Sequence, residues 1–482
     1  MKTTRRAFIQ CGSCGLTAAV LGAFKFPLLG PETAAAQVPP NLNINLSMEE
    51  ADVEMVDGTI VFHWLFQVQG NALPSVSGPV IFAFTGDVVT LNITNNLDEI
   101  HEFRILAAGP LGADLNTGPI APGQTVVLTF TAPAGGTYMY LDPRNAPVNR
   151  VLGLHGVFIA LPAAARALPG PGLRYPAPAP TPYSTPTAMV QRLFNHMATP
   201  LFNVRPSEPA QSWVPVRPPT EPIPHPFMMA FEDNVLAADT LTQLAILERF
   251  LFRTRIWVFN GIDPQFNAIA AAGGNAEPGG GIDPGAFQAN FLARYFHISG
   301  KTGEFASTSH VAPEITLSAF VGQPHVVRIV NAGVNDFSPH LHANHFYVLA
   351  VNNVPMANVV QPDSMTVTTL ERDIPRAQLP ANRLAASQTL ALEGGSRVDW
   401  LVPFQRPQDI PGDRDILLQD LIPEELAVVL DGVPQSPLMY PMHSHVELDQ
   451  TAAGGNYPQG LITHFEFLGE LINGQEVLFP HG

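Results

Sequence analysis

The sequence predicts an all-β protein with two similar β units. The chain has 48 prolines and 39 glycines in 482 residues, which is more than globular proteins usually carry. Short apolar runs separated by Gly and Pro turns recur in residues 37–165 and again in residues 286–482. Strands that repeat every 8–12 residues or so are typical of β-sandwiches and barrels.

Turn dipeptides mark the expected strands of the first unit. Asp57-Gly58, Gly86-Asp87, Pro122-Gly123 and Gly135-Gly136 each interrupt alternating or continuous apolar runs. Such dipeptides favour tight hairpin turns, because glycine adopts positive φ at no steric cost. We therefore expect strands within residues 53–68, 79–92 and 120–140.

The second unit repeats this pattern. Residues 313–352, 396–404 and 441–467 are β-branched and apolar, and Gly322-Gln323 takes the place that Gly86-Asp87 has in the first unit. This internal similarity predicts two β domains of one plan, 37–165 and 286–482.

Residues 166–285 differ in composition and are expected to connect the two units. Prolines crowd residues 169–186 and 206–226, which favours extended linker over packed structure. One short helix is expected over Thr240–Phe252, with Asp239 as its N-cap. Residues 227–231 and 255–260 read as short strands, and a reduced middle domain is the alternative.

The charge of the chain excludes some partners. The formal net charge is −17, and Lys301 is the only lysine beyond residue 36. Such a surface repels nucleic acids and anionic membranes, whereas it tolerates metal ions. After the leader, no apolar run reaches the length that spans a bilayer, so no membrane span is expected.

Residues 1–36 read as a twin-arginine signal peptide. Arg5-Arg6 precedes an apolar stretch, and Ala34–Ala36 offers a cleavage site. We therefore expect export to the periplasm or another extracytoplasmic location. Both cysteines, Cys11 and Cys14, lie in this leader, so the mature chain is expected to have no thiolate for metal binding.

Two H-x-H units are the strongest chemical signal. Residues i and i+2 of a strand share one face, so His340 with His342, and His443 with His445, each present two imidazoles together. Imidazole suits copper, zinc, iron or nickel. His101 in the first unit is the fifth informative histidine.

Five segments resemble ordered motifs of the multicopper oxidase family. In the first unit, residues 95–103 resemble the family's N-x-L…I-H-W-H motif, residues 136–140 its G-T-Y-W-Y motif and residues 153–156 its G-L-x-G motif. In the second unit, residues 338–343 resemble its H-P-x-H-L-H-G motif and residues 440–447 its H-C-H-I motif. The resemblance implies two cupredoxin-like domains joined by the Pro-rich segment, in a two-domain-like member of the family.

The resemblance also shows which copper ligands are missing. Phe337, Ser444 and Gln450 stand where the family's blue (type 1) copper has its His, Cys and His. The resemblance therefore implies a degenerate member that lacks the type 1 copper and its intense blue colour.

The eight histidine positions of the family's trinuclear cluster are partly kept. His101, His340, His342, His443 and His445 match five of them, and Phe103, Leu141 and Pro143 occupy the rest. His101 and His340 match the mononuclear (type 2) ligands, so one copper ion in a site drawn from the five histidines is expected. Asp142 and Glu447 are expected to act as hydrogen-bond partners, and His155 and His345 match no ligand position.

The resemblance implies an oxidoreductase that takes electrons from a small-molecule reductant, with dioxygen as acceptor. Two alternatives remain: a copper-binding protein without turnover, and a metal-free envelope scaffold of the same fold. Two-domain relatives assemble as trimers with the cluster between subunits, so in a homotrimer His101 is expected to face another chain's second domain.

Overall fold

The structure is a computed structural model. It describes residues 41–69, 76–161, 254–273, 281–307, 312, 315–320, 325–344, 346–355, 386–387, 389–402, 404, 429–430, 433–434, 438–472 and 475–478. All of these belong to one compact unit, Pro40–Gly482. The expected leader, the expected helix at 240–252 and the expected strand at 227–231 lie outside the described residues.

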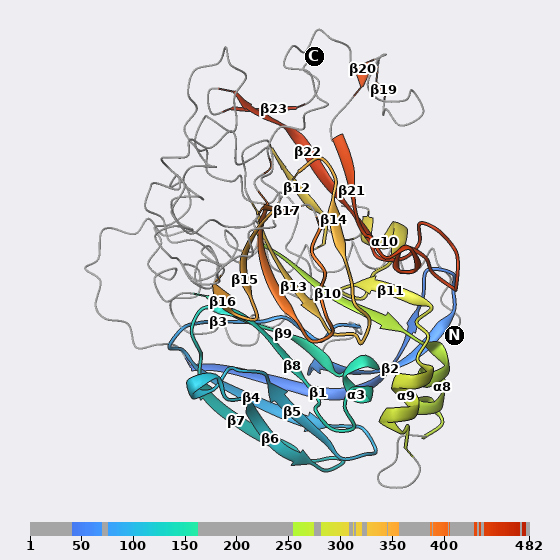
Figure 1. Cartoon of the computed structure of the whole chain (residues 1–482). Coiled ribbons are helices and arrows are strands. Elements are labelled where there is room, and N and C mark those ends of the chain that lie inside the picture. Colours follow the sequence, from blue (N-terminus) through green and yellow to red (C-terminus); the bar gives the residue numbers. More distant parts are fainter. Residues whose placement is uncertain are drawn as a thin grey trace, which may run out of the picture. The chain divides into compact units, whose positions relative to one another are not determined.

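The first β unit is a sandwich of two sheets (Figure 1). One sheet has the order β2-β1-β4-β7 and the other the order β3-β9-β8-β5-β6. The strands are β1 (Asn41–Glu54), β2 (Ile60–Val68), β3 (Ile81–Phe84), β4 (Val88–Asn95), β5 (His101–Ile105), β6 (Leu115–Ile120), β7 (Thr125–Thr131), β8 (Gly136–Leu141) and β9 (His155–Leu161), with short helices η1 (Pro110–Gly112) and α3 (Val148–Val151).

The second β unit also has two main sheets, with the orders β11-β10-β13-β18-β15-β16 and β12-β22-β21-β14; β17 pairs with β15 and β23 with β22. Its strands are β10 (Thr254–Ile262), β11 (Tyr295–Ile298), β12 (Leu317–Phe320), β13 (His325–Asn331), β14 (Pro339–Leu341), β15 (Phe346–Val351), β16 (Val354–Pro355), β17 (Ala386–Ser387), β18 (Arg397–Val402), β21 (Leu438–Ser444), β22 (Ile462–Ile472) and β23 (Gln475–Leu478). The described part also contains α8 (Pro264–Ala271), α9 (Pro284–Asn290), α10 (Gly303–Ser307), η6 (Glu447–Gln450) and a small hairpin of β19 (Val429–Leu430) and β20 (Val433–Pro434).

The two units repeat one topology. In the first, β1 runs parallel to β4 and β3 parallel to β9; in the second, β10 runs parallel to β13 and β12 parallel to β22. The remaining described pairings within these sheets are antiparallel, as the hairpin signals predict. The expected all-β fold with two cupredoxin-like units is therefore confirmed.

One strand of the second unit comes from the range expected to connect the units. Thr254–Ile262 forms β10, whose residues are all buried between β11 and β13. Two helices follow, α8 capped by Asp263 and α9 capped by Asp283, each with Pro at its first position. Such caps satisfy free backbone N–H groups at a helix start.

Alternation of polar and apolar residues explains the sandwich core. In β4 the side chains of Val89, Leu91 and Ile93 are buried, while Thr90 and Thr94 are half-buried on the other face. β8 is buried on both faces because its other face packs against the second unit. No helix among the described residues is long and apolar enough to span a membrane.

A cluster of buried, hydrogen-bonded polar side chains lies where the two β units pack together. Arg328 on β13 and Asp399 on β18 form an ion pair at 2.9 Å, with side chains 0% and 2% exposed. Thr137 on β8 donates to Asp399 Oδ1 at 2.6 Å and accepts from Arg328 Nη1 at 3.0 Å. These bonds tie the first unit to the second.

Candidate metal centre

Two neighbouring antiparallel strands, β14 and β21, carry the histidine pairs. Their register places His340 directly opposite His443 and Leu341 opposite Met442. Leu341 and Met442 are fully buried in the hydrophobic core of the second β unit, so His340 and His443 point to the other face of the sheet. Two backbone hydrogen bonds extend the β14–β21 pairing beyond the strand ends. The His342 N–H donates to Pro441 O at 3.1 Å, and the His445 N–H donates to Ser338 O at 2.8 Å.

The four imidazoles of this face cluster together. The ring centroids of His340 lie 4.9 Å from His342, 5.5 Å from His443 and 4.3 Å from His445. The centroids of His443 and His445 are 5.6 Å apart, with ring planes only 16° from parallel. The shared face expected for each H-x-H unit is present, and the cross-strand register brings the two units together. We call His340, His342, His443 and His445 the four-histidine face.

The nearest ring nitrogens suit a shared ligand. His342 Nε2 lies 3.0 Å from His443 Nε2. Two imidazole nitrogens that each bind one ion at about 2.0 Å lie about 2.8–3.3 Å apart for bond angles between square and tetrahedral. The same distance fits a hydrogen bond in which one neutral ring donates to the other.

Backbone and hydroxyl groups hold two of these rings. His443 Nδ1 lies 2.9 Å from Ser444 O, and His340 Nδ1 lies 2.7 Å from Thr389 Oγ1. A ring whose Nδ1–H is bound to a carbonyl presents Nε2 as the lone-pair atom, as metal-ligating histidines usually do. Partial desolvation of the ring, together with the charges of His443 and His445, lowers the pKa of His342, which favours the neutral form that binds metals.

Solvent reaches part of the four-histidine face. His342 and His445 are exposed, while His340 and His443 are half-buried. In the described part of the chain, no three His, Cys, Asp or Glu side chains stand as a ready metal site. The Nε2 atoms of His342 and His443 thus lie at metal-like spacing, and the rings of His340 and His445 would turn to join them around one ion.

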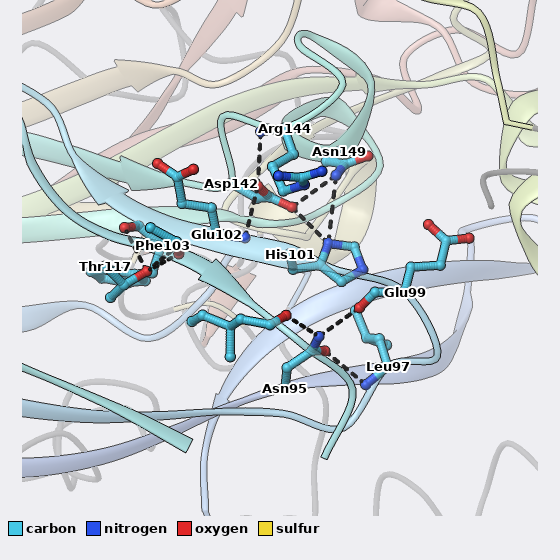
Figure 2. Close-up of polar contacts among 12 residues, drawn as sticks. Asn95, Leu97, Glu99, His101, Glu102, Phe103, Thr117, Asp142, Arg144 and Asn149 are labelled. Atoms are coloured by element: carbon cyan, nitrogen blue, oxygen red, sulfur yellow. Dashed lines mark hydrogen bonds and ion pairs between the residues drawn. The ribbon is translucent and has the colours of Figure 1, made fainter. Parts of the chain in front are cut away.

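His101 occupies a separate, fully buried place in the first unit (Figure 2). Its Nδ1 lies 2.6 Å from Asp142 Oδ2, and Asn149 Nδ2 donates to the same oxygen at 2.8 Å. Its ring meets Trp64 edge-on, with centroids 5.7 Å apart. The expectation that Asp142 acts as a hydrogen-bond partner is confirmed.

His101 makes these contacts only with residues of the first unit. Its Nε2 is buried and has no hydrogen-bond partner among the described residues. β5 explains the placement, because His101, Phe103 and Ile105 share the face that points into the core. The structure therefore gathers four of the five expected ligands and places the fifth in another set of contacts.

Two of the three positions that the family resemblance assigns to blue-copper ligands have other contacts in the structure. Phe337 is fully buried, and its ring packs edge-on against those of Phe259 and Phe296. Ser444 donates its hydroxyl to Asp449 Oδ2 at 2.8 Å. Burial raises the pKa of Asp449 to about 7, although the Ser444 bond opposes the rise. Phenyl and hydroxyl groups offer copper no soft ligand here.

Sequence reasoning missed Thr389 and Asp449 as supports of these positions. Thr389 is far along the chain from His340, and only the sheet bridge between them reveals the contact. Asp449 lies five residues beyond Ser444, within the turn of η6. Glu447, the other expected supporting carboxylate, is exposed.

Comparison with known proteins agrees with the motifs. Residues 68–164 match the family model for multicopper oxidase. The chain is 27% identical over 175 residues to a copper-containing nitrite reductase from Pseudomonas chlororaphis, covering 32% of this chain and 46% of that protein. It is 30% identical over 144 residues to the enzyme of the same name from Alcaligenes xylosoxydans xylosoxydans, covering 28% and 41%. These matches span less than half the length of either relative.

Solved structures give similar, weaker likenesses. The blue copper oxidase from Nitrosomonas europaea has a TM-score of 0.49 at 15% identity, with 89% of this chain and 86% of that chain covered. The copper nitrite reductase of the same organism has a TM-score of 0.44 at 15% identity, with 89% and 94% covered. The resemblance to the multicopper oxidase family is confirmed, most directly over residues 68–164.

Proposed function

We propose that this relative of the multicopper oxidases is an exported copper-binding oxidoreductase. Its copper is held by the four-histidine face, in a reduced, type 2-like site with no blue copper beside it. The observation that carries the proposal is the 3.0 Å approach of His342 Nε2 to His443 Nε2 on a face with two further imidazoles.

The residues fit copper in their chemistry. Four neutral imidazoles are borderline-soft nitrogen donors, which suit copper well. Copper held there would supply one-electron redox chemistry. The Thr389 hydroxyl and the Ser444 carbonyl orient His340 and His443, so less ring freedom remains to be lost when an ion binds.

The openness of the face suits a small reductant. His342 and His445 are exposed, so a small molecule can approach the rings from solvent. The chain has no thiolate relay beyond residue 36, so electrons must arrive directly at this face. The proposed reaction is one-electron oxidation of a small molecule, with dioxygen as the acceptor.

Export, subunit number and the fifth ligand belong to the proposal as well. Arg5-Arg6 supports twin-arginine export with removal of residues 1–36. In the proposed homotrimer, a neighbouring subunit brings its first unit to this face. His101 is buried against Trp64 and Asp142, so it becomes the fifth ligand only when assembly exposes its Nε2. Replacing Arg5 and Arg6 by lysine should leave the protein in the cytoplasm; unchanged export would mean another route.

A metal-free or non-catalytic scaffold is the second candidate function. It is favoured by the lack of three converging donor side chains among the described residues. The two functions differ in metal content, because a scaffold keeps its fold and binds no copper.

The test is metal analysis of protein produced with copper supplied, followed by oxidation assays with small phenols and metal ions as reductants. The proposal predicts bound copper with an electron paramagnetic resonance signal typical of nitrogen-ligated, non-blue copper. Absence of copper would favour the scaffold, and bound copper without turnover would leave a copper-binding protein.

A further inference from the structure

A second group of histidines, which are not part of the four-histidine face, is buried where the two β units pack. His63 on β2, His155 on β9 and His297 on β11 are 1%, 0% and 0% exposed. His63 and His155 come from the first unit and His297 from the second. Buried histidines of this kind usually have partners for both ring nitrogens.

Here only one nitrogen of each ring is satisfied. His63 Nδ1 lies 3.0 Å from Val61 O, and His155 Nδ1 lies 2.7 Å from Arg150 O. His297 Nδ1 accepts the Gly300 N–H at 3.0 Å. The Nε2 atoms of all three rings are buried and have no hydrogen-bond partner among the described residues.

The strand faces bring the three rings to one region. Val61, His63 and Leu65 share a face of β2. Val61 packs with Tyr295, two residues before His297 on β11. Leu65 at the other side borders Gly153, two residues before His155.

Further contacts join the segments that carry these three histidines. The Gly78 N–H donates to His155 O at 2.8 Å, and Val76 packs against Gly300, whose N–H holds His297. Asn260, paired with His297 across β10 and β11, donates to Val151 O at 2.9 Å.

Charged groups of both signs stand on the elements around these three histidines. Asp52 on β1 acts on His63, and Arg150 acts on His155. Asp263 precedes α8, Tyr295 lies on β11 and Lys301 follows β11. The other elements packed against β2, β9 and β11 carry further titratable groups, which are Glu49, Glu50 and Glu54 on β1, Tyr138 and Tyr140 on β8, Arg255 on β10, and Glu447 and Asp449 on η6. Arg150 is cationic, so it opposes a further positive charge there.

We propose that His63, His155 and His297 form an acid-sensitive latch between the two β units. While the imidazole rings are neutral, they pack in the junction between the two β units, and burying their uncharged polar atoms costs little free energy. Once protonated, each ring carries a charge into a buried region whose other histidines repel it, and the junction loosens.

The direction of titration agrees with this role. Burial lowers the pKa of His63 and of His155 to about 4 and holds the pKa of His297 well below its usual range. The unfolded chain therefore binds more protons than the folded chain between pH 6.5 and 4, and stability falls as the pH falls through that window. At pH 5, His63 and His155 should each add about 0.9 proton to the difference.

The test compares the pH dependence of unfolding in the full chain. The unfolding constant of the wild type should rise steeply as pH drops near 5, and His63→Gln and His155→Gln should each reduce that rise by about eightfold per pH unit. His297→Gln should reduce it in the same direction. Asn267→Ala is the matched control: it removes a 2.6 Å bond to Phe62 O in the same region but no titrating group. It should lower stability equally at every pH.

Hydrogen exchange separates a latch from general acid instability. At pH 5, corrected for intrinsic exchange rates, β2, β9 and β11 should lose protection before β4 and β13 do. A histidine variant with the wild-type pH slope, or exchange that rises uniformly over both units, would overturn the proposal. If a variant fails to fold, the wild-type exchange pattern alone decides the outcome.

Discussion

Removing Asp399 should destabilise the protein more than almost any other single polar change. The substitution Asp399→Leu leaves the Arg328 guanidinium at the junction of the β units, 0% exposed and without its 2.9 Å carboxylate partner. Burial already lowers the pKa of Arg328, and Asp399 is the charge that opposes this fall. Breaking a buried pair from one side typically costs about 3–5 kcal/mol.

The Thr137 hydroxyl adds to this cost, because it donates to Asp399 Oδ1 at 2.6 Å. One such bond to a charged group contributes about 1.5–3 kcal/mol. We expect a total loss of about 5 kcal/mol, near the lower end of the summed ranges and a large part of the 5–15 kcal/mol or so by which domains are stable.

Urea unfolding at pH 7, followed by tryptophan fluorescence, measures this loss. Thr137→Val should cost about 1.5–3 kcal/mol and serves as the milder control. The double variant Arg328→Met/Asp399→Leu should recover most of the stability, because the buried Arg328 charge is removed together with its partner. A loss below about 1 kcal/mol for Asp399→Leu, or a double variant no better than the single, would refute the reasoning.

Three further predictions concern other parts of the chain. Between pH 8 and 5 the free energy of unfolding should fall by about 2 kcal/mol for each of His63 and His155, as urea titrations at both pH values can check; a flat profile contradicts the buried, neutral state. Ser444→Cys should bind copper without an intense blue absorption band, since the other blue-copper positions hold no imidazole; a blue spectrum would disprove that. Gly156→Ala should cost about 1–3 kcal/mol by thermal melting, because its Cβ would meet the Tyr140 ring; an unchanged melting temperature argues against tight packing there.

The sequence predicted the fold well because its signals were local. Turn dipeptides such as Gly86-Asp87 do fall between strands, here β3 and β4. The i and i+2 rule placed His340 with His342 on one face correctly. The register that sets His340 opposite His443 depends on pairing between distant segments, which no local pattern encodes.

The surroundings of single histidines could not be predicted in the same way. His101 matches a ligand motif, yet β5 turns its ring toward Trp64 and Asp142 in the core. His63 and His297 stand in no motif at all, and only the packing of two units shows that they are buried. Burial of this kind arises from tertiary contacts, so composition and spacing give no signal for it.

Copper content of the mature protein and of one double variant tests the central claim most directly. Purified wild-type protein, folded with copper supplied, should contain about one copper per chain by elemental analysis. His342→Ala/His443→Ala removes the two nitrogens that lie 3.0 Å apart and should abolish that copper while the circular dichroism spectrum is kept. Wild-type protein without copper, or a folded double variant that keeps it, would contradict the account.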